Sequence, residues 1–197
     1  MSAGTILCMA GNKIFMDYSS SLGPIDPQVV TDPNRTGNYQ YVPALGYLDM
    51  VERLTLKSSN NTISPAEYAI LQNLDLAMLR RYEQARDLSV DLLKKWLINY
   101  KFNNWTVHSS NQTLLGQPVR QREKEDRAEN IAKLLGDNKI WHSHGRSIGI
   151  QTLQQDLRLK IEDYSSDIAL TEKIRVYNTT LGEYFASKRL PFVLHSA

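Results

Sequence analysis

The chain opens with Met1-Ser-Ala-Gly-Thr-Ile-Leu-Cys-Met-Ala10, which is followed by Ile14-Phe-Met-Asp17 and by Leu22-Gly-Pro-Ile-Asp-Pro27. Small residues followed by apolar ones predict a short helix over residues 3–10, ended by Gly11-Asn12. The apolar Ile-Phe-Met run predicts a short buried strand. The two prolines push the residues before them into extended geometry, which predicts a tight loop. This stretch therefore predicts a short apolar helix, a buried strand and a tight loop, in that order.

Ser2 stands where the first predicted helix begins. A hydroxyl at this position lies near the positive end of the helix dipole and beside unpaired backbone N–H groups. That setting suits a nucleophile whose reaction passes through an oxyanion. Ala3 and Gly4 are small enough to let a substrate or another backbone approach closely. The alternative is structural, because serine is also a favoured residue for capping the start of a helix.

The first 28 residues also resemble the sequences of a known protein family. Ser2-Ala-Gly-Thr5, the Ile-Phe-Met-Asp strand and Ser21-Leu-Gly-Pro-Ile-Asp-Pro-Gln28 are similar to the serine dehydrogenase proteinase family. That family belongs to the group of Clp protease and signal peptide peptidase A, serine peptidases of the Clp/crotonase fold. The likeness is specific over residues 2–28, looser to about residue 100 and weaker beyond it. No Gly-x-Gly-x-x-Gly phosphate cradle is present, so dehydrogenase chemistry is not expected.

The resemblance implies an α/β fold: the C-terminal part of a Clp/crotonase-like domain, with few strands and mostly helical, followed by a helical C-terminal extension. It implies that Ser2 is the nucleophile and that the backbone of Ala3 and Gly4 contributes to an oxyanion site. In the family the main oxyanion cradle lies upstream of the nucleophile. We therefore expect a truncated or split serine peptidase that needs a missing N-terminal half or a homo-oligomer, with a peptide or protein as substrate.

A serine nucleophile needs a base, and the loop from Leu22 to Asp26 contains no histidine. Signal-peptide-peptidase-A relatives use a lysine downstream, just before a Thr/Ser-x-x-Glu helix start. Lys57 precedes Ser64-Pro-Ala-Glu67 in this way, so the resemblance implies a Ser2–Lys57 mechanism. Burial would make such a lysine easier to deprotonate. The alternative is that Lys57 only stabilises the end of a helix, where a cation is favoured. Lys13 is a weaker candidate for the general base.

His142 and His144 are the other residues that suggest chemistry. Alternate residues of a loop can reach one metal ion, but a third ligand is needed and no nearby cysteine or acidic cluster supplies it. No metal site and no cofactor are therefore expected, and a structural turn or a contact with substrate or a neighbouring subunit is the preferred reading. Cys8 lies among apolar residues and is expected in the core.

The spacing of apolar residues and the helix start and stop signals predict helices in most of the remaining chain. A capping box at Ser64 begins a long amphipathic helix that is expected to run without a break to about Asn99, with Leu71, Leu74, Met78, Tyr82 and Leu88 on its buried face. The predicted organisation is a partial peptidase domain over 1–102, a linker or lid over 103–120 and a helical region over 121–197. Further helices are expected over 43–57, 120–135, 150–159 and 171–187, and a loop or short hairpin over 31–41.

The amino-acid composition argues against some classes of function. The 197 residues are 42% hydrophobic and 22% charged, and the net charge of +2 argues against a dominant role with nucleic acid or anionic membranes. No apolar run has the length of a membrane span, and no signal peptide is recognisable. We expect a soluble cytoplasmic protein. A non-catalytic helical assembly piece that packs against another chain is the alternative function.

Overall fold

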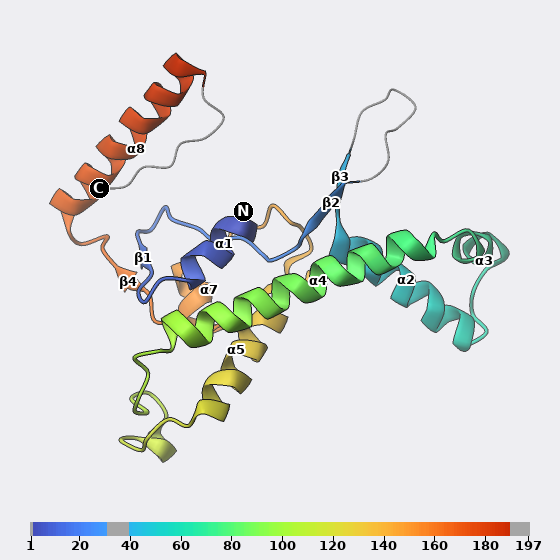
Figure 1. The fold of residues 1–197 in the computed structure, drawn as a ribbon, viewed down its shortest axis with the longest axis horizontal. Coiled ribbons are helices and arrows are strands. Elements are labelled where there is room, and N and C mark those ends of the chain that lie inside the picture. Colours follow the sequence, from blue (N-terminus) through green and yellow to red (C-terminus); the bar gives the residue numbers. More distant parts are fainter. Residues whose placement is uncertain (1, 31–39, 190–197) are drawn as a thin grey trace.

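The computed structural model describes residues 2–30 and 40–189, and it describes Ser2 through its backbone alone. The described chain is mostly helical with a few short strands, which agrees with a mixed α/β class (Figure 1). The longer helices are α1 (Ser2–Met9), α2 (Ala44–Ser59), α3 (Pro65–Gln72), α4 (Leu76–Trp96), α5 (Gln121–Leu135) and α8 (Ile168–Lys188). The shorter elements are β1 (Phe15–Met16), β2 (Gln28–Val30), β3 (Tyr41–Pro43), α6 (Asn138–Trp141), α7 (Ile150–Gln155) and β4 (Glu162–Asp163).

The strands form two separate pairs. β1 lies parallel to β4, with Phe15 opposite Glu162, and β2 lies antiparallel to β3, with Val29 opposite Val42. A two-stranded pair has little stability of its own in water. Both pairs therefore depend on the helices that they contact, and the fold is decided by helix packing.

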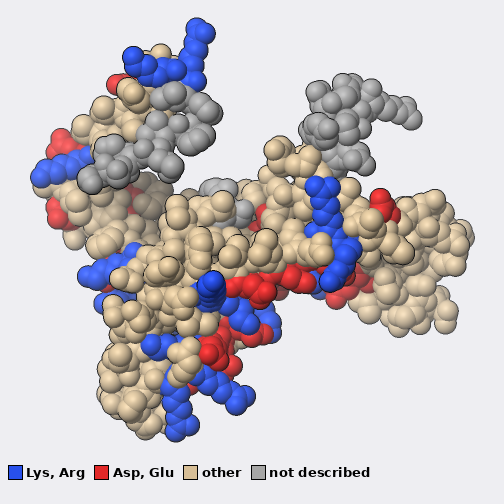
Figure 2. Space-filling model, in the orientation of Figure 1, with Lys and Arg blue, Asp and Glu red and all other residues tan. Residues whose placement is uncertain are grey.

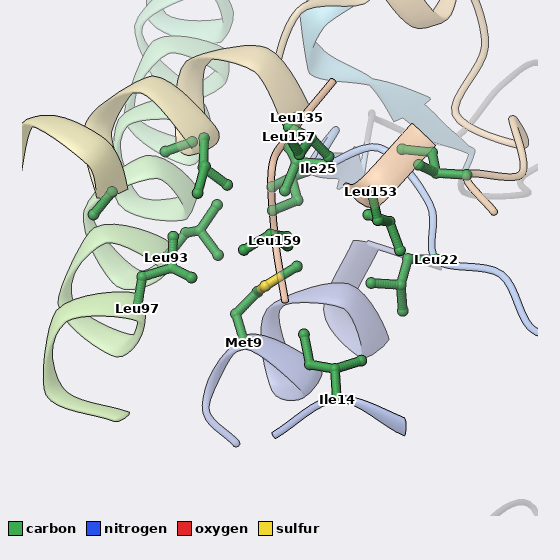
Figure 3. Close-up of a cluster of buried hydrophobic side chains, with 14 of the residues drawn as sticks. Met9, Ile14, Leu22, Ile25, Leu93, Leu97, Leu135, Leu153, Leu157 and Leu159 are labelled. Atoms are coloured by element: carbon green, nitrogen blue, oxygen red, sulfur yellow. The ribbon is translucent and has the colours of Figure 1, made fainter. Parts of the chain in front are cut away.

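The main apolar core joins distant parts of the sequence. α1, α4, α5 and the segment from Ile148 to Ile161 all contribute side chains to it. Figure 3 shows Met9 of α1 facing the region between Leu93 of α4 and Leu159. Met9 and Leu93 are fully buried. The core thus contains residues from the first and from the third of the units predicted from the sequence.

A second, smaller cluster holds α2 against α4. It contains Val29, Ala44 and Tyr82, all buried. The ring of Tyr47 stacks on that of Tyr82 with centroids 4.5 Å apart. The aromatic pair adds to the area that it buries. This contact fixes where α2 lies along the first half of α4.

The long helix expected from Ser64 to Asn99 is not continuous, so that prediction was wrong. The capping box at its start is confirmed, because the Ser64 hydroxyl accepts from the Glu67 N–H and the Glu67 carboxylate accepts from the Ser64 N–H. The helix then ends at Gln72, and the side chain of Asp75 caps a new helix by accepting from the next backbone amides. An N-cap residue inside an apolar pattern favours a new start over continuation. Leu88, expected on the buried face, is 60% exposed.

Segment 103–120, predicted as a linker or lid, has a short antiparallel arrangement. The N–H of His108 donates to the carbonyl of Gln117 at 3.0 Å, and that of Val119 donates to the carbonyl of Thr106 at 2.9 Å. Nε2 of His108 lies 3.2 Å from the Glu123 carboxylate. This imidazole therefore ties the segment to the first turn of α5.

α8 differs from the other long helices because none of its described side chains is buried. It projects from the body of the molecule and is joined to it through β4 (Figure 1). Arg175 anchors it, donating to the Tyr18 hydroxyl at 2.8 Å and lying 3.7 Å from the Asp17 carboxylate. Its apolar residues, including Ile168 and Val176, remain exposed to solvent.

The remaining sequence predictions match closely or fall outside the described residues. The helices expected over 3–10, 43–57 and 120–135 are confirmed as α1, α2 and α5. The helix expected over 150–159 is shorter, and that expected over 171–187 begins earlier, at Ile168. The predicted loop or hairpin over 31–41 lies mostly outside the described residues, which contain its flanking strands β2 and β3.

Charge is distributed without a single dominant sign on the visible face. Figure 2 shows acidic and basic side chains intermixed along α4 and α5. Lys94 and Lys133 both contact Glu129, at 3.0 and 2.8 Å. Among the described helices, none combines the length and the apolar character that crossing a bilayer requires.

The core contact of α4 predicts the cost of shortening one of its side chains. Leu93→Ala should lower the free energy of unfolding by about 2–5 kcal/mol, because it leaves a cavity in the main core. Urea unfolding followed by circular dichroism measures this loss. Leu88→Ala is the matched control on the same helix and should change stability by less than about 0.5 kcal/mol. Equal losses for the two variants would contradict the position of the core.

Candidate functional site

The candidate nucleophile stands at an open helix start. Ser2 is the first residue of α1, and Ala3 and Gly4 are exposed. A Cβ added at Gly4 would meet no atom within 4 Å. The backbone N–H groups of this first turn have no partner within the helix. Another molecule can therefore approach the start of α1.

The Gly-Pro loop is fastened to α1 by a buried threonine. The Thr5 hydroxyl donates to the carbonyl of Gly23 at 2.8 Å and accepts from the N–H of the same glycine at 2.9 Å. Thr5 is 1% exposed. Two buried hydrogen bonds to one residue fix both the distance and the angle between helix and loop. The Thr5 side chain thus has a positioning role that explains a hydroxyl inside an apolar helix.

The same loop carries a buried carboxylate that faces an imidazole. Asp26 is 2% exposed, and its Oδ1 accepts from the N–H of Leu45 at 3.1 Å, near the start of α2. Nδ1 of His144 lies 4.0 Å from Asp26 Oδ2. Burial raises the pKa of the Asp26 carboxyl, although the Leu45 N–H and the nearby His144 oppose this rise. Within the part of the chain that the structure describes, Nδ1 of His144 is the one buried side-chain atom lacking a hydrogen-bond partner.

Backbone pairing places His144 beside this loop. The N–H of Leu22 donates to the carbonyl of Ile148 at 3.0 Å, and the reverse bond is 2.8 Å long. Sequence reasoning missed the juxtaposition of Asp26 and His144 because it searched the loop itself for a histidine. No local pattern identifies it, since the two residues lie in distant segments. His142 is exposed and adopts a left-handed backbone conformation at the end of α6.

Lys57, the expected base, lies in the last turn of α2 and is bound to another residue. Its Nζ lies 2.5 Å from Glu67 Oε1, with 39% of the lysine side chain exposed. This hydrogen bond, together with the N–H and hydroxyl of Ser64, holds the pKa of Glu67 at about 2. A carboxylate in contact stabilises a charged ammonium, whereas a general base must be neutral.

The start of α1 and the end of α2 lie in different parts of the molecule (Figure 1). The structure therefore does not bring Ser2 and Lys57 together within one chain. It does connect α1 to Asp26 and His144, because Gly23 bonds Thr5 and Leu22 pairs with Ile148. Lys13 is exposed.

No metal centre is visible in the described residues. Residues 2–30 and 40–189 hold no group of three histidine, cysteine, aspartate or glutamate side chains able to bind an ion. Cys8 is half-buried against the main core, and burial raises the pKa of its thiol. A thiol of this kind is a weak nucleophile at neutral pH.

The chain was also compared with known proteins. Comparison with protein-family models, with curated proteins and with solved structures finds no match for this chain.

The Lys57–Glu67 contact predicts that replacing Lys57 changes the pKa of Glu67. Lys57→Met should raise the pKa of Glu67 from about 2 toward its ordinary value of 4.5, because the largest favourable contact of the carboxylate is lost. The bonds from Ser64 should keep part of the depression. Carboxyl ¹³C shifts followed against pH measure this. Lys13→Met is the control, and an unchanged Glu67 pKa in Lys57→Met would contradict the ion pair.

Asp26 predicts a pH-dependent stability difference. Its pKa is raised in the folded state, so its contribution to stability is present at low pH and is lost as the pH rises through the folded pKa. Asp26→Asn does not titrate and keeps an oxygen for the Leu45 N–H. The stability of Asp26→Asn relative to the parent should therefore increase from acidic to neutral pH in urea unfolding. The exposed Asp156→Asn is the control, and a difference that falls with pH would refute this account of Asp26.

Proposed function

We propose that this chain supplies the nucleophile-bearing part of a serine peptidase of the Clp/crotonase fold. The observation that carries the proposal is the position of Ser2 at the exposed start of α1, preceding Ala3 and Gly4. The resemblance of residues 2–28 to the serine dehydrogenase proteinase family supports the same reading. In the proposed reaction the Ser2 hydroxyl attacks a peptide carbonyl and the amine leaves, after which water releases the acyl group.

Stabilisation of the oxyanion falls only partly to this chain. The N–H groups of the first turn of α1, including those of Ala3 and Gly4, are donors for a developing negative charge. We infer that the remaining donors come from residues outside those described, either an N-terminal half or a second copy. The apolar side chains of Leu7 and Phe15, 68% and 59% exposed, provide surface that such a polypeptide would cover.

Two residues are candidates for the general base that deprotonates Ser2. Lys57 follows from the resemblance, but it is bound to Glu67. His144 faces the buried carboxylate of Asp26, on a loop fastened to the serine's own helix through Thr5. In a serine triad a carboxylate orients the imidazole through a hydrogen bond to Nδ1. Here the two atoms lie 4.0 Å apart, and the link of Asp26 to α1 through Gly23 and Thr5 supports His144 as the candidate base.

A second function is favoured by α8. A helix of 21 residues that buries none of its described side chains is typical of a segment that packs against another chain. In this reading the protein is a non-catalytic assembly piece, and Ser2 has no chemical role. The two functions differ in one testable property, the nucleophilicity of Ser2.

Labelling with a fluorophosphonate separates these possibilities. The chain, assembled with any N-terminal half that precedes it, should form a Ser2 adduct detectable by mass spectrometry, and Ser2→Ala should lose the adduct and peptide hydrolysis without loss of fold. Ser110→Ala, at an exposed serine, is the control. His144→Gln should lower the labelling rate by about a hundredfold if His144 is the base, and Lys57→Ala should do so if Lys57 is. An unlabelled Ser2 in the intact assembly would reject the peptidase and leave the assembly function.

A further inference from the structure

One face of α2 borders a groove that includes Lys57, one of the two candidates for the base, among its lining residues. The groove has a volume of about 390 Å³ and is formed by a single helical stripe from Asp49 to Asn60, closed by Thr62 and by Lys139 of α6. This volume is within the range of sites that hold small ligands. The groove lies away from α1, on the part of α2 that Figure 1 shows beside α4 and α3.

The charged side chains that α2 contributes to the groove are separated by sign, and Lys139 of α6 lies beside Glu52. Asp49 and Glu52 come first along the stripe, and Arg53 and Lys57 follow. Leu56 also lines the groove, and it is 56% exposed. The groove therefore presents an acidic part, a basic part and an apolar side chain at the basic part.

Two of these charges are already neutralised by the protein. Glu52 lies 3.2 Å from the Nζ of Lys139, and Lys57 is bound to Glu67. Asp49 instead accepts a hydrogen bond at 2.7 Å from the uncharged amide of Asn138.

Among the residues that the structure describes, the hydrogen bond of the Arg53 guanidinium goes to the sulfur of Met50, at 3.0 Å. Within the described residues, neither Asp49 nor Arg53 has an oppositely charged group within 4.0 Å, although they stand one helical turn apart. An arginine fork without a carboxylate and a carboxylate without a cation are both available to a ligand.

We propose that this groove binds the two charged ends of a short peptide, with its ammonium at Asp49 and its carboxylate at Arg53. One helical turn of four residues separates the two groups by about 6 Å along the axis. An extended dipeptide or tripeptide spans about 7–10 Å between its ends, which these side chains can reach. Leu56 then contacts an apolar side chain of the peptide. This inference does not depend on peptidase activity, since it concerns binding at Asp49 and Arg53, which have no role in the proposed reaction.

Titration of the full chain with the tripeptide Ala-Leu-Ala tests the proposal. Saturable amide shifts in two-dimensional ¹H–¹⁵N spectra should map to α2 and α6. N-acetylation or C-amidation of the peptide should each weaken binding about tenfold, because each removes one charge-assisted contact. A fully blocked peptide should show no saturation. Absence of saturation with Ala-Leu-Ala, or equal binding of the blocked peptide, would overturn the proposal.

Two variants assign the orientation. Asp49→Asn should weaken binding of the free peptide but not of the N-acetylated one, and it keeps an oxygen for Asn138. Arg53→Gln should weaken binding of the free peptide but not of the C-amidated one. Asp126→Asn and Arg122→Gln, an exposed pair with the same spacing on α5, are the matched controls and should bind like the parent. If the controls lose as much affinity as the groove variants, the binding reflects overall charge and the assigned site is wrong.

Discussion

Burial of apolar side chains around Met9, Leu93 and Leu135 is the constraint on which the rest of the described structure depends. These residues come from α1, α4 and α5, three helices that are far apart in the sequence. With only two short strand pairs, backbone pairing contributes little to holding the elements together. The core therefore fixes α1, and through Thr5 it also fixes the Gly-Pro loop that carries Asp26.

Buried polar side chains hold the segments around this core in place. The Thr5 hydroxyl forms two hydrogen bonds to Gly23, and Asp26 holds the first turn of α2 through the N–H of Leu45. A buried carboxylate is costly unless it is bonded, and the 4.0 Å separation from His144 leaves its second oxygen without a close cation. Sites with such incomplete compensation are where natural proteins depart from the most stable arrangement, often for function.

The exposed apolar surface lies on elements that the core does not cover. Leu7 on α1, Phe15 on β1 and several apolar residues of α8, such as Ile168 and Val176, are exposed. Single exposed apolar residues are common, whereas a long helix without a buried side chain is unusual. Both proposed functions thus require a further polypeptide, which in the peptidase completes the oxyanion site and in the assembly piece covers α8.

The sequence by itself determined the local elements whose signals are contiguous. The helix after Ser2 and the capping box at Ser64 follow from residues within a few positions of one another, which set local backbone energies. The break before Asp75 also had a local signal, an N-cap residue that the apolar periodicity outweighed in the prediction. Only the tertiary structure decided that Lys57 pairs with Glu67 away from Ser2, and that His144 faces Asp26. Those contacts depend on how separate helices pack on one core, and no short-range pattern encodes that packing.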